Sequence, residues 1–168
     1  APHVPPEQVS FRSSDGLGTV TGTTDFGGGP LASAGMTDVY VAEISPAGTH
    51  VWSSRHGGSG SENAQSVAVD SVGAVVLTGL FSGSADFGGG MVSSAGGTDI
   101  FVLKLSGTGA YAWDYTYGSS GQDEGRSVAV DAAGNVGVTG IFSGSVDFGG
   151  GLLSSLGGLD IFLVVLGP

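Results

Sequence analysis

The pentapeptide Asp-Phe-Gly-Gly-Gly occurs three times, at residues 25–29, 86–90 and 147–151, with a constant spacing of 61 residues. The same spacing separates three further aspartates, each followed by a β-branched and then an aromatic residue: Asp38, Asp99 and Asp160. Residues 67–107 and 128–168 are identical at about 25 of 41 aligned positions. Similarity at a fixed period of this length indicates tandem structural units, each packed against its neighbours.

Each full unit contains four runs that are typical of β-strands, found in the second unit at residues 66–70, 74–79, 99–105 and 110–117. Short turns rich in Gly and Ser connect the first run to the second and the third to the fourth, as in antiparallel hairpins. No window has apolar residues at a sustained helical period, and the 34 glycines disfavour helix. The sequence therefore predicts an all-β chain.

Four antiparallel strands in a tandem unit are typical of one blade of a β-propeller. The first two runs carry small apolar residues, which suit the crowded strands near a propeller axis. The fourth run carries Trp113, Tyr115 and Tyr117, which suit the wider gap between outer strands. A β-helix would need shorter repeats, and a β-sandwich would not repeat so faithfully. We therefore expect a single β-propeller domain over residues 1–168.

The repeat also predicts where the blades lie, and we expect the last one to be incomplete in this sequence. We expect blades at about residues 7–56, 64–117 and 125–168. The first blade has a divergent inner hairpin, from residues 8–12 to residues 19–22, and the third blade stops before its outer strand. Three blades cannot close a ring, which needs four to eight. Either the chain is part of a longer protein or, as we favour, two copies close a six-bladed homodimer, with His3-Val4 pairing with the partner's last blade.

The runs at residues 64–70 and 97–105, together with Gly79, resemble the bacterial SBBP-type β-propeller repeat, and residues 128–136 match it most closely. The resemblance covers nearly the whole chain and is weakest in the first unit. It implies the propeller fold and a secreted or cell-surface location. It implies no catalytic residues, because no shared reaction comes with the repeat.

The composition excludes several classes of protein. No apolar run approaches the length that a membrane-spanning helix needs, which is roughly 18 residues. The chain has no cysteine and therefore no disulfide or thiolate metal site. Its 15 acidic and 4 basic residues give a net charge of −11, which repels the phosphates of nucleic acids and suits the capture of cations.

The acidic residues are the candidate ligands of a cation. The long loop at residues 81–98 and the loop between blades at residues 118–126 are expected on one face of the ring, opposite the hairpin turns. Carboxylates and exposed carbonyls of this kind suit Ca²⁺. The candidate Ca²⁺ ligands are Asp25, Asp38, Asp86, Asp99, Asp147 and Asp160, and the candidate ligand-binding residues are Glu62, Asp123 and Glu124. As alternatives, the repeated aspartates accept hydrogen bonds from nearby backbone amides, and the other three are merely solvated.

No pattern points to catalysis. The three histidines, His3, His50 and His56, do not recur between units, and no nucleophile motif accompanies them. Trp52 and Trp113 occupy equivalent positions that suit packing between blades better than stacking on a sugar. We therefore expect a non-enzymatic extracellular or cell-surface β-propeller that acts as a binding or scaffolding module, with Ca²⁺ as its candidate cofactor. The alternatives are a glycan-binding, lectin-like module and a hydrolase or lyase on the same scaffold.

Overall fold

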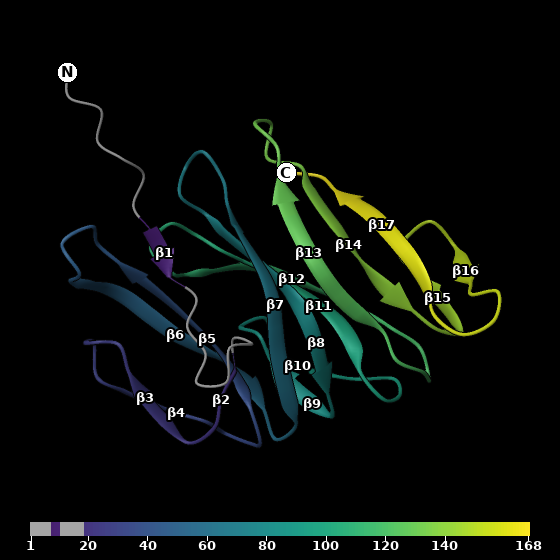
Figure 1. Cartoon of the computed structure of the whole chain (residues 1–168), viewed down its shortest axis with the longest axis horizontal. Helices are drawn as coiled ribbons and strands as arrows, with labels where there is room; N and C mark the ends of the chain where they lie inside the picture. The colour runs from purple at the N-terminus through teal and green to yellow at the C-terminus, as the bar shows by residue number, and fades with distance from the viewer. Residues whose placement is uncertain (1–7, 11–18) are drawn as a thin grey trace.

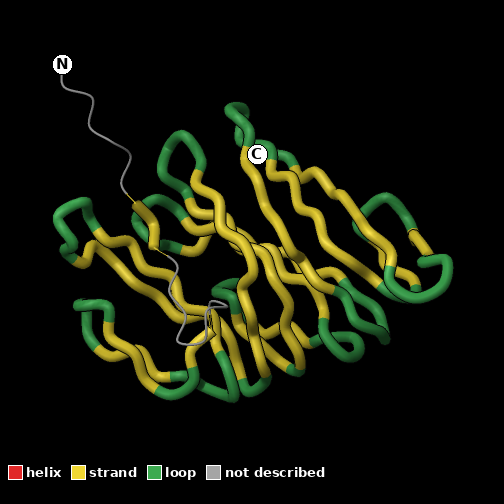
Figure 2. The backbone as a smooth tube through the Cα atoms, in the orientation of Figure 1, coloured by secondary structure: helices red, strands yellow, loops and turns green. Residues whose placement is uncertain are grey.

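The computed structural model describes residues 8–10 and 19–168, and all regular structure in these residues is β-strand (Figures 1 and 2). Within this part of the chain there is no helix long and apolar enough to cross a membrane. The strands are β1 (Gln8–Ser10), β2 (Thr19–Val20), β3 (Thr23–Asp25), β4 (Pro30–Ala32), β5 (Asp38–Ile44), β6 (His50–Gly58), β7 (Ser61–Val69), β8 (Val75–Ser82), β9 (Ser84–Asp86), β10 (Met91–Ser93), β11 (Asp99–Leu105), β12 (Tyr111–Tyr117), β13 (Glu124–Val130), β14 (Val136–Phe142), β15 (Ser145–Asp147), β16 (Leu152–Ser154) and β17 (Asp160–Leu166).

The second repeat unit forms a four-stranded antiparallel sheet in the order β12-β11-β8-β7. These are the four strands that the sequence predicted, although β7 and β8 are longer than expected. Asp70 closes the turn between them, because its Oδ1 accepts the N–H groups of Val72 at 3.0 Å and Ala74 at 2.8 Å. The turn between β11 and β12 lies at the same end of the sheet, where Lys104 Nζ is 3.6 Å from Asp70 Oδ2.

The central strands β8 and β11 of this second sheet are buried on both faces, because the sheet lies between a first and a third sheet (Figure 1). Successive residues of a strand point to opposite faces. On β8, Leu77 belongs to the apolar core shared with the first sheet, and Val76 belongs to the core shared with the third. Phe101 and Ile100 divide in the same way on β11. Burying each such side chain stabilises the fold by roughly 1.5–3 kcal/mol, so the two cores hold the three sheets together.

The first sheet differs from the predicted blade. Its strands β1 and β2 both pair with β5, at Ala42–Ile44 and Asp38–Val39 respectively, and do not pair with each other. The expected inner hairpin of the first unit is therefore not seen in the described strands, and its residues 11–18 lie outside the described part of the chain, as does His3-Val4. Beyond β5 the sheet continues through β6 to β9 and β10, which belong to the second unit. A hairpin of one unit thus extends the sheet of the unit before it.

The third sheet has three described strands, in the order β13-β14-β17, so β17 forms its edge. On the face turned away from the second sheet, Ile161, Leu163 and Val165 are 80%, 74% and 64% exposed. We call these three residues the open face. The repeat equivalents of the first two are Ile100 and Val102, which are completely buried against the third sheet.

The segment expected to be a long loop at residues 81–98 contains the hairpin β9–β10, and the other units contain β3–β4 and β15–β16 in the same place. The prediction of an all-β chain is confirmed. The described sheets are stacked in a row and do not close into a barrel or ring. The propeller, its number of blades and the homodimer therefore stay predictions.

Candidate functional site

The aspartates of the repeated pentapeptide close the hairpin tips. Asp86 ends β9, and its Oδ1 accepts the N–H groups of Gly88 at 2.8 Å and Gly90 at 3.2 Å. These glycines have φ angles of 121° and 117°, which residues with a side chain rarely adopt. Asp25 and Asp147 make the same pair of bonds in their own hairpins. The bonds explain the repetition of these aspartates without a metal ion.

The second row of aspartates begins the strands β5, β11 and β17. Asp38 Oδ2 accepts the N–H of Ala34 at 2.6 Å, and Asp99 Oδ2 accepts that of Ala95 at 2.8 Å. Asp160 makes the corresponding bond to a residue four positions earlier, at 2.7 Å. Asp38 is completely buried and Asp99 is 4% exposed. Each aspartate of this row therefore ties the loop before its strand to the start of the strand.

Asp38 also belongs to a cluster where the first and second sheets meet, which we call the first joint: Asp38, Arg55 and Glu62. Its two carboxyl groups are completely buried, whereas the Arg55 side chain is 31% exposed. Arg55 Nη1 lies 3.5 Å from Asp38 Oδ2, and Glu62 Oε2 accepts the N–H of Gly58 at 2.9 Å. Neither Asp38 Oδ1 nor Glu62 Oε1 has a donor partner. Gly57 leaves room for both carboxyl groups, because a Cβ at that position would collide with Asp38 Oδ1 and Glu62 Oε2.

Burial is the main reason that the pKa of Glu62 rises from 4.5 to about 7. The hydrogen bond from Gly58 acts in the opposite direction, whereas the neighbouring Asp38 carboxyl raises the pKa further, and Arg55 lowers it. Two neighbouring buried carboxyl groups do not both ionise easily, because each negative charge disfavours the other. The first joint can therefore take up and release a proton near neutral pH.

The second joint repeats this arrangement between the second and third sheets with Asp99 and Asp123. Asp123 stands at the position equivalent to Glu62, and its shorter side chain is fully bonded: Oδ2 accepts the N–H of Ser119 at 2.7 Å, and Oδ1 accepts that of Ser143 at 3.0 Å. Thr116 replaces Arg55, so this joint lacks the cation of the first. The pKa of Asp99 is raised by burial and by the charge of Asp123, against the hydrogen bond from the Ala95 N–H.

The interpretation of Glu62 and Asp123 as solvated carboxylates is therefore wrong, because both side chains are completely buried. Glu124 is different: it lies nearer the surface and pairs with Arg126 at 3.2 Å. Within the described residues, no three His, Asp or Glu side chains are grouped so that they could hold a metal ion. This geometry does not test whether the aspartates bind Ca²⁺ or whether Glu62, Asp123 and Glu124 bind a ligand. Both sites stay predictions.

One serine–histidine pair lies in the core between the first two sheets. Ser54 Oγ is 2.9 Å from His56 Nε2, and His56 Nδ1 is 2.8 Å from the carbonyl oxygen of Phe87. A carbonyl only accepts, so Nδ1 carries the hydrogen and Nε2 accepts from Ser54. Burial lowers the pKa of His56, which favours the neutral ring. The imidazole is 8% exposed and is oriented by a carbonyl instead of a carboxylate, an arrangement that suits packing better than catalysis.

The two tryptophans lie in different surroundings. Trp52 donates its indole N–H to Glu43, and a Cβ at Gly109 would come within 2.6 Å of its ring, so the turn of the second unit covers it. Trp113 instead begins an aromatic row on β12, with ring centroids 5.3 Å from Trp113 to Tyr115 and 6.2 Å from Tyr115 to Tyr117. Tyr115 is 48% exposed. Packing between sheets therefore explains Trp52, whereas the row on β12 is partly uncovered.

Sequence reasoning named no residue of the open face and missed the cation of the first joint. The open face was detectable from Ile161 and Leu163, whose repeat equivalents are apolar, and from Val165, which replaces Lys104. Arg55 had no such signal, because its partners come from β5 and β7 and its position does not repeat. Comparison with protein-family models and with curated proteins finds no match to this chain. The resemblance to the SBBP-type repeat thus rests on the residues quoted above.

Proposed function

We propose that this chain is a non-enzymatic scaffolding or binding module, built as three consecutive blades of a β-propeller, and that a second copy covers its open face. The observation that carries the proposal is the contrast between equivalent residues of successive units. Ile100 and Val102 are completely buried by the following sheet, whereas Ile161 and Leu163 are exposed. Exposed apolar patches on a soluble domain mark sites of association.

The repeated packing supports a second copy as the partner. The face of the second sheet that contacts the third includes β11, and β17 has the same pairing and alternation in the third sheet. The open face on β17 therefore suits contact with another sheet of the same kind. A contact of this head-to-tail type either closes a ring or grows into a filament. Closure by two copies gives six blades, which lies in the usual range of propellers.

The resemblance to the SBBP-type repeat supports an extracellular or cell-surface location, and the net charge of −11 supports solubility there. A scaffold of this kind needs no catalytic group, and the buried carboxyl groups of the two joints serve the contact between sheets. Ca²⁺ stays a candidate ligand of the two aspartate rows, although their hydrogen bonds account for the repetition without it.

The molar mass of the chain in solution tests this proposal. Light scattering is expected to give twice the chain mass at high concentration and to fall toward one chain mass on dilution. Leu163→Lys places a charge in the open face and is expected to keep the chain monomeric. Val72→Lys is the matched control, because Val72 is 82% exposed in a turn away from the open face. A molar mass of one chain at every concentration would refute the proposal that a second copy covers the open face.

A further inference from the structure

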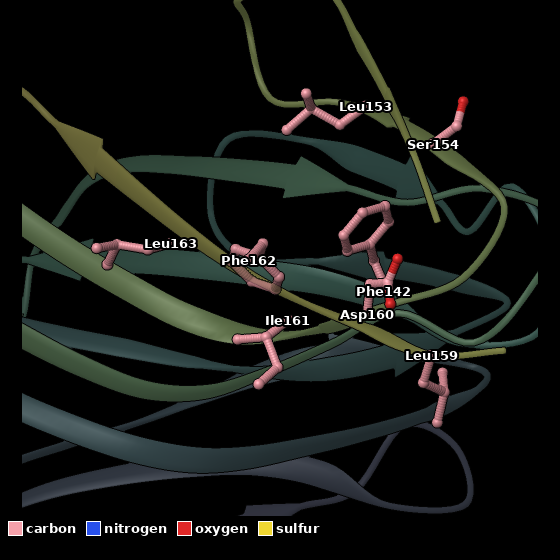
Figure 3. Close-up of a pocket in the computed structure, with 8 residues that line it drawn as sticks. All are labelled: Phe142, Leu153, Ser154, Leu159, Asp160, Ile161, Phe162 and Leu163. Carbon is pink, nitrogen blue, oxygen red and sulfur yellow. The ribbon is translucent and has the colours of Figure 1, made fainter. Parts of the chain in front are cut away.

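An open groove of about 630 Å³ runs beside the edge strand β17 and the hairpin β15–β16 (Figure 3). Its walls are mainly apolar, with one carboxylate and one hydroxyl. The residues that line it are Phe142, Leu153, Ser154, Leu159, Asp160, Ile161, Phe162 and Leu163. The groove thus lies where the third sheet has no fourth strand among the described residues.

The second unit contains the same place in its filled form. There Ile100 pairs with Tyr117, Phe101 with Thr116, and Val102 with Tyr115 on β12. Residues 161–163, which line the groove, are the repeat equivalents of residues 100–102. The groove therefore occupies the position of an antiparallel strand, bordered by the free edge of β17.

A chain of aromatic contacts links the second sheet to this position. The ring contacts of the β12 row continue from Tyr117 to Phe148 at 5.3 Å and from Phe148 to Phe162 at 4.7 Å, which brings the row to the groove wall. In the preceding pair of sheets, Gly109 covers Trp52, which is the repeat equivalent of Trp113. On the same row, Tyr115 is 48% exposed.

We propose that this edge binds an extended segment of another polypeptide, which adds to β17 as a fourth antiparallel strand. Main-chain hydrogen bonds supply the affinity in such strand addition, and alternate side chains supply the specificity. The side chains that turn toward the aromatic row must be small, because the row fills the gap between the sheets. β12 itself has this pattern: Asp114 and Thr116 pair with Leu103 and Phe101, which face the first sheet.

The chain supplies its own probe for this site. A labelled peptide with the sequence of residues 106–118 is titrated against the full chain, diluted until it is monomeric, and binding is followed by fluorescence anisotropy. Saturable binding is expected. A peptide with proline in place of Tyr115 and Thr116 is expected not to bind, since successive residues of a strand direct their N–H groups to opposite edges and one of the two must face β17.

Substitutions in the protein locate the peptide. Tyr115→Ser removes part of the aromatic row and is expected to weaken binding by about tenfold. Tyr111→Ser is the matched control: Tyr111 is 41% exposed on the same strand, but its hydroxyl donates to Asp114 and its ring lies against Gly88 on the other side of the sheet. The Tyr111→Ser protein should bind the peptide with the same affinity as the unmodified chain.

The outcomes distinguish the strand site from the proposed dimer. A chain that binds the peptide yet stays monomeric at every concentration supports the strand site and refutes the dimer. A chain that dimerises through the open face but does not bind the peptide when monomeric refutes the strand site alone. Equal binding of the proline peptide, or an unchanged affinity in Tyr115→Ser, also overturns the strand site.

Discussion

Replacing Glu62 with glutamine should make the protein more stable above neutral pH. In the first joint the Glu62 carboxyl is completely buried, and its pKa is raised to about 7, mainly by burial. Ionising it therefore costs more in the folded protein than in the unfolded chain. A glutamine has the same shape, its oxygen accepts the N–H of Gly58, and its amide can donate to Asp38 Oδ1, which lacks a donor.

The sign and size of the effect follow from proton linkage. A carboxyl group whose pKa is higher in the folded state holds more protons there, so stability falls as pH rises from the unfolded pKa to the folded one. Between 4.5 and about 7, this loss reaches about 3 kcal/mol at most. Glu62→Gln removes the titration and also the attraction to Arg55. We therefore expect a gain of about 2 kcal/mol at about pH 8 and little change at about pH 5.

Urea unfolding followed by tryptophan fluorescence, across this pH range, measures the difference between the two proteins. Asp123→Asn in the second joint is the matched control. Asparagine has one carbonyl oxygen, so it keeps only one of the bonds from Ser119 and Ser143, and a loss of about 1–2 kcal/mol is expected at about pH 8, where Glu62→Gln is expected to gain stability. The reasoning fails if Glu62→Gln is less stable than the unmodified chain at about pH 8. It also fails if the unmodified chain and Glu62→Gln lose the same stability between about pH 5 and about pH 8.

Two further pairs of substitutions test the local geometry by urea unfolding and thermal melting. Gly57→Ala drives a Cβ into Asp38 Oδ1 and Glu62 Oε2 and should cost more than about 2 kcal/mol, whereas Gly150→Ala, with no atom within 4 Å of its Cβ, should change stability by less than about 0.5 kcal/mol. Equal effects would contradict the crowding of the joint. Asp86→Ala should lower stability by about 1–2 kcal/mol, with or without Ca²⁺, while Asp86→Asn keeps the accepting oxygen and stays close to the unmodified chain. A Ca²⁺-dependent rise in Tm that Asp86→Asn abolishes would instead assign the carboxylate to the ion.

The repeat made the strands predictable, because the 61-residue spacing, the turn glycines and the alternation of apolar residues agree with one another. The hairpin β9–β10 was missed because its strands have three residues each and too few apolar positions to alternate. The burial of Glu62 was missed because its neighbours, Ser61 and Asn63, are polar. What buries it is a sheet from another unit, and such contacts leave no periodic pattern near the residue itself.

The two joints place an acidic residue of one unit against the strand-starting aspartate of the unit before it, Glu62 against Asp38 and Asp123 against Asp99. The second joint binds its extra carboxylate with backbone amides, whereas the first adds Arg55 and a carboxyl group whose pKa is raised by burial. Asp160 begins β17 with the same backbone bond as its equivalents, but the described residues include no following unit. A partner that covers the third sheet is therefore expected to contact the open face with apolar side chains. It is also expected to offer hydrogen-bond donors, or a proton, to the Asp160 carboxylate. Asp160 Oδ2 already accepts the N–H of Leu156, so apolar burial alone would leave the other oxygen without a donor, which disfavours a purely hydrophobic contact at this end of the stack.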